Sequence, residues 1–208
     1  MVDIRHGAIH VIGGTIFDFI NPETSTFDIN DVAHSLARLC RFTGHVTFES
    51  YTVGQHSLEA SYLVPPNLAL ATLLHDATEF VINDLSSPLK ELLLDYRRLE
   101  AIVEREVMRR FGIPIELFQP HMHPLIKHAD LVMLATERRD VCPQSDVRWA
   151  CLDGIEPRAA RIREMRPNEV KAQFLCRYFE LKGTYIFNSL ERGITQENQN
   201  VLERERSW

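Results

Sequence analysis

The chain has 208 residues, of which 45% are hydrophobic and 25% are charged, and its net charge is −6 at pH 7. These values are typical of one globular domain with a sizeable core. The negative charge argues against a protein that binds nucleic-acid polymers, because such binding needs basic surface to neutralise phosphates. It is compatible with a small anionic substrate, since a few cations or a metal ion can reverse the field inside one pocket.

The sequence shows neither a membrane-spanning apolar stretch nor a signal peptide, so we expect a cytoplasmic protein that does not contact a membrane. The four cysteines are widely spaced and include no Cys-x-x-Cys pair, which argues against a zinc ribbon and a thioredoxin-type motif. We expect reduced, partly buried packing residues at Cys40, Cys142, Cys151 and Cys176.

The first part of the chain predicts a small β-hairpin followed by a helix. Within residues 8–20, two short apolar runs flank a pair of glycines, a pattern typical of a hairpin. From Ile29 the apolar residues recur with helical spacing, and Asp28 or Asn30 is available as the cap. We expect this helix to end near residues 41–44.

The rest of the chain predicts further helices, over residues 52–65, 67–83, 88–111, 124–141 and 166–181. Ser87 is expected to cap the helix that starts at Pro88, and Gly183 to follow the last one. Residues 142–166 lack a clear period, and we interpret Trp149 as a packing anchor there. We therefore predict an all-α bundle with a small N-terminal hairpin. One domain covers residues 1–188, and a polar C-terminal tail covers residues 189–208.

The stretch 73–79 (Leu-Leu-His-Asp-Ala-Thr-Glu) joins an apolar run to three polar groups. If the helix over residues 67–83 is unbroken, His75 and Glu79 lie on one helical face with Asp76 beside them. A His-Asp pair at the end of an apolar run is costly to bury unless both side chains are satisfied. A divalent cation satisfies both, through an imidazole nitrogen and a carboxylate oxygen.

Four ionisable residues are each set among apolar neighbours in three of the predicted helices: His56, His75, Asp76 and Asp130. For any one of them, a paired group in the core is the simpler interpretation. Together, two histidines and two carboxylates suit a divalent transition metal with open coordination for water and substrate.

In their order along the chain these residues resemble the HD-domain metal-dependent phosphohydrolases. The resemblance is to the small 5′-deoxynucleotidases and the related phage-type deoxynucleotide triphosphohydrolases. It rests on five stretches within residues 36–140: Leu39-Cys-Arg-Phe-Thr-Gly-His45, Tyr51-Thr-Val-Gly-Gln-His-Ser57, Leu73-Leu-His-Asp-Ala-Thr-Glu79, Asp84-Leu-Ser-Ser-Pro-Leu-Lys90 and His128-Ala-Asp-Leu-Val-Met-Leu-Ala-Thr-Glu137. The N-terminal segment and the last sixty or so residues take no part in it.

The resemblance implies a bundle of the HD-domain type and a role for each matching residue. One divalent transition metal (Co, Mn, Zn or Fe) is expected on His56, His75, Asp76 and Asp130. Glu79 is expected to orient or deprotonate the attacking water, and Asp84 to be a second catalytic or sugar-contacting carboxylate. An Asp that caps a loop is the alternative for Asp84. Substrate contacts are expected from Arg41, Phe42 and Lys90.

The resemblance further implies a homo-oligomer that acts on a deoxynucleotide. We expect a 5′-deoxynucleotidase that releases phosphate from monophosphates. The alternative is a triphosphohydrolase of the dATPase type. Ser86 stands where the deoxynucleotidases have proline, and the Arg-Phe-Thr-Gly-His form of residues 41–45 resembles phage and prophage members, among which triphosphate-cleaving enzymes occur. A non-catalytic nucleotide-binding regulator and a hydrolase of guanosine alarmones or cyclic nucleotides are the further alternatives. The sequence leaves open the base preference, the native metal and the number of subunits.

Overall fold

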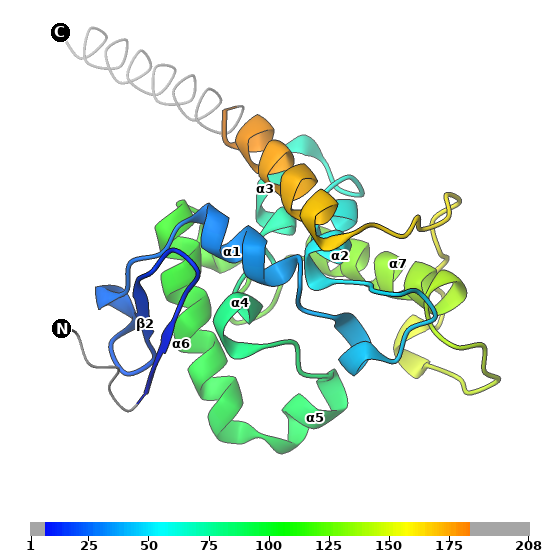
Figure 1. The fold of residues 1–208 in the computed structure, drawn as a ribbon. Helices are drawn as coiled ribbons and strands as arrows, with labels where there is room; N and C mark the ends of the chain where they lie inside the picture. Colours follow the sequence, from blue (N-terminus) through cyan, green and yellow to red (C-terminus); the bar gives the residue numbers. More distant parts are fainter. Residues whose placement is uncertain (1–6, 184–208) are drawn as a thin grey trace, which may run out of the picture.

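The structure, a computed structural model, describes residues 7–183. These residues form a mostly helical fold with one two-stranded antiparallel sheet, which confirms the predicted fold class. The sheet lies at one end of the molecule and the irregular segment 142–166 at the other (Figure 1). The expected C-terminal tail, residues 189–208, lies outside the described residues.

The predicted hairpin consists of β1 (Ala8–His10) and β2 (Ile16–Asp18), with Ile9 opposite Phe17. Phe17 is fully buried, and its ring centroid lies 5.7 Å from that of Phe80, a residue of the helical core. The backbone N–H of Gly13 donates to the Asp31 carboxylate at 2.7 Å, which fastens the turn of the hairpin to the first helix. The hairpin therefore acts as a cover for the helical core.

The first two helices start where the sequence predicts, and Asp28 is the cap of the first. Helix α1 (Ile29–Leu36) starts at a capping box on Asp28, and α2 (Val53–Ala60) starts at Thr52. However, α1 ends several residues earlier than expected. The chain beyond α1 pairs with the segment before α2 through a bridge between Cys40 and Thr52, and a 3-10 turn (Arg41–Gly44) follows.

The expected unbroken helix over residues 67–83 is wrong, because the structure has two helices there. Helix α3 (Pro66–Leu73) starts one residue before the expected range, and α4 (Glu79–Ile82) follows a tight turn. Inside the turn the Ala77 amide donates to the Leu74 carbonyl at 3.0 Å, and the Glu79 amide to the Asp76 carbonyl at 3.1 Å. These bonds span three residues instead of four, so His75 and Glu79 do not share the face of one helix.

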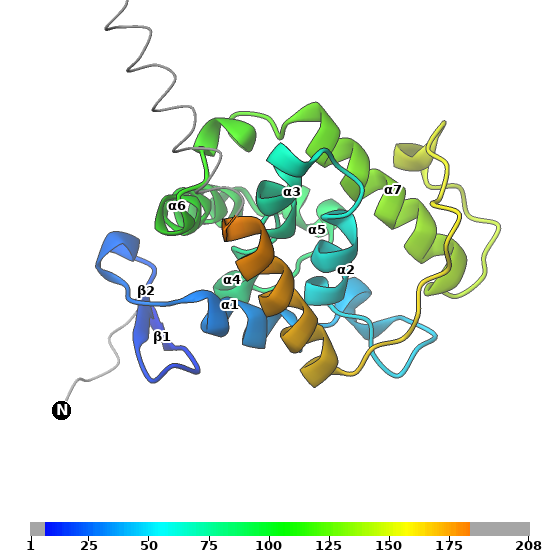
Figure 2. The ribbon, with the colours of Figure 1, turned by 90° about the horizontal axis from the view of Figure 1, so that it is seen from above.

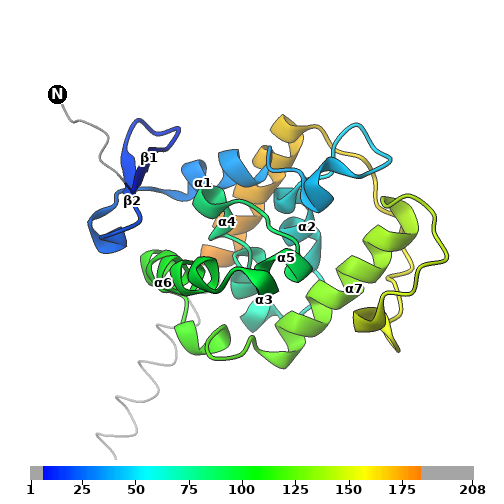
Figure 3. The same cartoon turned by 90° about the horizontal axis from the view of Figure 1, so that it is seen from below.

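The expected helix over residues 88–111 is also divided, into α5 (Ser87–Leu92) and α6 (Leu94–Phe111). The residue before α5 is Ser86, and its side chain makes no capping bond, so the predicted Ser87 cap is wrong. In a continuous helix residues 90 and 100 would be about 15 Å apart along the axis. The break lets Lys90 reach Glu100, with 2.7 Å between Nζ and Oε1. Seen from below, α5 lies between α6 and α7 (Figure 3).

Helix α7 (Pro124–Asp140) matches its prediction, and the segment after it contains only the short 3-10 turn Ala150–Leu152. Residues 167–183 form a C-terminal helix that crosses α1 and α2 (Figure 2). A Cβ added at Gly54 of α2 would come within 3.0 Å of Val170 and of the α1 backbone, so the glycine permits this close approach. Gly183 is the last described residue.

Most buried apolar residues form one cluster, in which the hairpin, α1, α4 and α6 meet around Phe17, Phe27 and Phe80. A smaller cluster around Tyr51 and Met133 lies beneath the turn that follows α1. Within residues 7–183, each helix is too short or too polar to cross a membrane.

Candidate metal centre

Two histidines from different segments face each other in the interior. His56 lies on α2 and is fully buried, and His75 lies in the turn between α3 and α4 and is 4% exposed. Their Nε2 atoms are 3.3 Å apart. Two imidazoles placed in this way repel each other unless a proton or a cation lies between their nitrogens.

The outer nitrogen of each ring has an acceptor, which determines where the proton of each neutral imidazole resides. His75 Nδ1 donates to the Thr72 carbonyl at 2.7 Å, and His56 Nδ1 to the Glu137 carboxylate at 2.6 Å. A carbonyl and an ionised carboxylate only accept hydrogen bonds, so both Nδ1 atoms carry hydrogen. The two Nε2 atoms are then free to bind a metal, as in carboxylate–histidine–metal sites.

Two carboxylates complete this group. Asp76 Oδ2 is 3.2 Å from His75 Nε2 and 3.8 Å from His56 Nε2. Asp130 Oδ1, from α7, is 3.3 Å from His56 Nε2 and 4.0 Å from His75 Nε2. His56, His75 and Asp130 each present a ligand atom within 4.8 Å of the others. The four residues expected to hold a metal therefore come together, and we call them the metal centre.

The electrostatics of the metal centre favour a bound positive charge. Burial and the Arg41 charge oppose protonation of His56, yet the carboxylates of Glu137 and Asp130 prevail and raise its pKa to about 10. A divalent cation would supply the same positive charge and, in place of the proton, bind both Nε2 atoms. The donor set, two imidazoles and two carboxylates, suits a divalent transition metal. The residues present therefore fit the expected cofactor.

Glu137 is the most important residue of the site that the sequence analysis missed. It lies on α7, fully buried, and accepts from His56 Nδ1 at 2.6 Å, Tyr51 Oη at 2.9 Å and an Arg41 guanidinium nitrogen at 3.2 Å. Burial alone would raise the pKa of Glu137, but the charges of Arg41 and His56 hold it below its usual value. One signal was available: Glu137 is seven residues after Asp130, which places both on one face of a helix.

The metal centre opens into a cavity of about 560 Å³, a volume typical of sites for small molecules. Asp76 and Asp130 of the metal centre line it, together with every other residue expected at the site: Arg41, Phe42, Glu79, Asp84 and Lys90. The lining also includes Lys127 and Trp149, to which the sequence analysis gave no role at the site. Lys127 Nζ is 2.8 Å from the outer oxygen of Asp130.

Glu79 is a carboxyl group placed to exchange a proton. It is 5% exposed, and among the described residues its Oε2 atom has no hydrogen-bond partner. Burial, followed by the charges of Asp76 and Asp84, raises the pKa of Glu79 well above its usual value. Lys90 Nζ is 3.8 Å from the other oxygen, Oε1, and partly offsets this effect. A buried carboxyl group with a raised pKa is typical of general acid–base residues.

Two strained backbone segments border the cavity. Phe42 and Thr43 have φ values of 54° and 53°, and Asn83, which precedes Asp84, has φ 65° and ψ 161°. Such conformations cost about 1–3 kcal/mol each for residues other than glycine, and they cluster at functional sites. Burial raises the pKa of Asp84 as well, although Arg41 opposes the shift.

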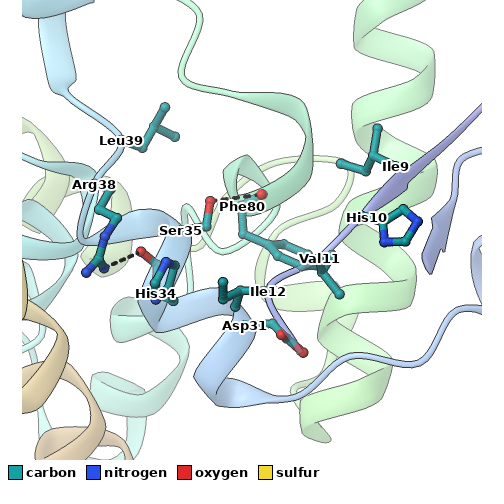
Figure 4. Close-up of a pocket in the computed structure, with 10 residues that line it drawn as sticks. All are labelled: Ile9, His10, Val11, Ile12, Asp31, His34, Ser35, Arg38, Leu39 and Phe80. Atoms are coloured by element: carbon teal, nitrogen blue, oxygen red, sulfur yellow. Dashed lines mark hydrogen bonds between the residues drawn. The ribbon is translucent and has the colours of Figure 1, made fainter. Parts of the chain in front are cut away.

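A second hollow, of about 350 Å³, lies between the hairpin and α1 (Figure 4). Three of its polar side chains already bond to protein atoms: Ser35 Oγ donates to the Phe80 carbonyl at 2.9 Å, Arg38 donates to the His34 carbonyl at 3.1 Å, and the Asp31 carboxylate accepts from Gly13. Within residues 7–183, the group of metal-capable side chains is the one at the other cavity. We therefore take the cavity at the metal centre as the functional site.

The chain is similar to two bacterial proteins. It is 38% identical over 166 residues to the uncharacterized protein YfdR of Escherichia coli (strain K12), and the match covers 79% of this chain and 89% of YfdR. It is 31% identical over 184 residues to the uncharacterized protein RCAP_rcc00048 of Rhodobacter capsulatus, covering 82% and 93% of the two chains. No protein-family model matches the chain.

Proposed function

The chain belongs to the same family as YfdR of Escherichia coli, and we propose that it is a divalent-metal-dependent nucleotide phosphohydrolase. The observation that carries the proposal is the pair of Nε2 atoms, 3.3 Å apart, beside the carboxylates of Asp76 and Asp130, which line a cavity together with Glu79. The HD-domain resemblance of residues 36–140 supports the same function. We propose a 5′-deoxynucleotidase that converts deoxynucleoside 5′-monophosphates to deoxynucleoside and phosphate.

The metal centre would hold the cation on His56, His75, Asp76 and Asp130, where a bound divalent metal acidifies water and offsets phosphate charge. Glu79 Oε2 would take the proton of the attacking water as the new bond to phosphorus forms. Its raised pKa makes it a stronger base than an ordinary glutamate. Glu79 would then return this proton to the leaving 5′ oxygen as the old bond to phosphorus breaks. Asp84 lines the same cavity and would be a second catalytic or sugar-contacting carboxylate.

The cations of the cavity would bind the phosphate. Arg41 is held by Glu137 at 3.2 Å and Asp76 at 3.5 Å, and its buried Nε has no hydrogen-bond partner among the described residues. Lys90 lies beside Glu79 and Glu100. Because protein carboxylates fix both cations in advance, they lose little freedom when the phosphate binds.

A second candidate, a triphosphohydrolase of deoxynucleoside triphosphates, is favoured by Lys127. This residue adds a third cation to the cavity lining, and its side chain is 52% exposed. The metal, Arg41 and Lys90 would already offset the charge of one phosphate, whereas a triphosphate carries enough charge to engage Lys127 as well.

The function is tested by assaying dAMP and dATP side by side with the metal-loaded protein. Phosphate released from dAMP supports the monophosphatase, and intact triphosphate released from dATP supports the alternative. Including guanosine alarmones and cyclic nucleotides in the same panel tests the remaining substrates. If none of these phosphoesters is cleaved under any metal loading, the proposal is wrong.

We also propose that the protein forms a homo-oligomer. Four exposed leucines near the cavity, at the junction of α5 and α6, offer an apolar surface for a second copy: Leu89, Leu92, Leu93 and Leu94. Light scattering coupled to gel filtration measures the number of subunits, and a monomer at all concentrations would contradict the proposal.

A further inference from the structure

Two aromatic rings from distant parts of the chain meet on the wall of the cavity. Phe42 comes from the turn after α1 and Trp149 from the segment after α7, and both line the cavity. Their ring centroids are 6.2 Å apart and their planes are inclined by 50°. Because of this inclination, a flat ligand is able to lie parallel to only one of the two rings.

Phe42 is already engaged by the protein. The Arg41 guanidinium carbon lies 5.3 Å from the centre of its ring, and the ring packs against the smaller apolar cluster around Tyr51. The positive φ of Phe42 fixes the direction in which the side chain leaves the backbone. Phe42 therefore forms a rigid side wall.

Trp149 is held from outside the cavity. The guanidinium carbon of Arg138 lies 5.5 Å from the indole centroid, and the same side chain donates to the Val147 carbonyl. Arg138 does not line the cavity, whereas Trp149 does. The indole is only partly buried and belongs to neither apolar cluster, so it is not the packing anchor that the sequence predicted. Its position leaves ring surface for a ligand.

The chemistry of the cavity requires a ligand with two unlike ends. The cations and carboxylates around the metal centre suit a phosphoester, and they would bind inorganic phosphate or a sugar phosphate equally well. Such ligands have no apolar group that could contact the apolar part of the lining, which includes Met122 and Leu134 besides the two rings. A nucleobase is flat and stacks well on an aromatic side chain.

We propose that Trp149 is a specificity-determining residue, on whose indole the nucleobase of the substrate stacks while Phe42 limits its sideways position. The inference rests on the proposed function in that it takes the substrate to be a nucleotide. Stacking on one aromatic side chain is sufficient to change base affinity by about tenfold to a hundredfold. The larger face of a purine gains more than that of a pyrimidine.

The kinetic test compares dAMP with deoxyribose 5-phosphate, which has the same phosphoester and no base. Trp149→Leu keeps apolar bulk without a flat ring. We expect it to lower the ratio of kcat/KM for dAMP to that for deoxyribose 5-phosphate by at least about tenfold, mainly through KM. We expect Trp149→Phe to recover most of the ratio. Phe179→Ala, which removes an exposed aromatic ring outside the cavity lining, is the matched control and leaves the ratio unchanged.

The binding test needs no turnover. The sequence has two tryptophans, so Trp208→Phe leaves Trp149 as the single indole reporter. Deoxyadenosine is expected to quench its fluorescence in a saturable way, and deoxyribose is expected to leave it unchanged. This titration uses the native ring, and so it remains valid if Trp149→Leu does not fold.

The two tests separate failure of the inference from failure of the proposed function. If dAMP and deoxyribose 5-phosphate lose activity equally in Trp149→Leu, or if deoxyadenosine does not change the fluorescence, the base does not stack on Trp149. If no phosphoester is cleaved but deoxyadenosine quenches the fluorescence, the proposed function fails and the base site stands.

Discussion

Glu137→Gln removes one negative charge from the interior while keeping the size of the side chain. The carboxylate accepts three hydrogen bonds, from His56 at 2.6 Å, Tyr51 at 2.9 Å and Arg41 at 3.2 Å. A glutamine oxygen is able to accept two of them. Its amide group would then face the Arg41 guanidinium, donor against donor. Arg41 would keep Asp76, at 3.5 Å, as its remaining charged partner.

Two effects of this change are measurable. Loss of one charge-assisted bond and weakening of two others is expected to lower the free energy of unfolding by about 3 kcal/mol. Because Glu137 orients His56 through Nδ1, metal affinity is expected to fall by about tenfold to a hundredfold. Urea denaturation of the metal-free protein measures the first effect, and calorimetric titration with Mn²⁺ measures the second.

Glu106→Gln is the matched control. Glu106 is also a buried glutamate, on α6, and bonds to Arg109 at 2.7 and 2.8 Å, outside the cavity lining. Since Arg109 is 62% exposed, this substitution is expected to cost about 1 kcal/mol or less and to leave metal affinity unchanged. If Glu137→Gln loses stability but binds Mn²⁺ as tightly as the wild type, Glu137 is a structural residue and the reasoning is refuted.

Three further predictions address the base, the metal and the packing of the irregular segment. Glu79→Gln is expected to lower kcat by about a hundredfold or more with nucleotide affinity retained; unchanged turnover would remove Glu79 from the mechanism, and a wild type that binds nucleotides without turnover would favour the regulator. Mn²⁺ at a hundred times its Kd is expected to raise the Tm by about 5–10 °C in the wild type and not in His75→Ala, and an equal rise in both would contradict the assigned ligands. Asp140 anchors residues 161 and 162 to α7, and its bonds with Arg139, opposed by burial, lower its pKa. Asp140→Asn is therefore expected to lower the free energy of unfolding by about 2 kcal/mol at pH 7.

The predicted effect of Asp140 has a definite pH dependence. Because the pKa of the folded state lies below the unfolded value of about 3.9, the contribution of Asp140 is complete above that value. It is lost as the pH falls through the lower, folded-state pKa. Urea denaturation of wild type and Asp140→Asn at pH 7 and pH 2.5 measures this, and a difference that does not shrink at the lower pH would contradict the assignment.

The features that the sequence predicted well are local ones. The cap at Asp28, the start of a helix near Thr52 and the end of a helix at residue 111 each depend on a few neighbouring residues, and the structure has all three. The hairpin follows from two apolar runs around a pair of glycines in the same way. The fold class rests on such local signals and is confirmed.

The features that the sequence missed depend on contacts between distant segments. Helical periodicity continues through residues 74–78 and through Leu93, yet the helix is interrupted at both places. The first break brings His75 and Asp76 to His56, and the second brings Lys90 to Glu100. The spacing of residues within one helix does not predict such contacts between distant segments, nor the interruptions that allow them. The role of Glu137 could not be predicted for the same reason, because its partners Arg41, Tyr51 and His56 lie 81 to 96 residues before it in the sequence.

The central claim, that one cation held by His56, His75, Asp76 and Asp130 is required for phosphoester cleavage, is tested most directly by titrating the metal-free protein with Mn²⁺. Bound metal per chain and the rate of phosphate release from dAMP are measured on the same samples, with triphosphate release from dATP in parallel. The rate is expected to rise in proportion to bound metal and to saturate at one equivalent per chain. Full activity without metal, or saturation with metal and no hydrolysis of either nucleotide, would contradict it.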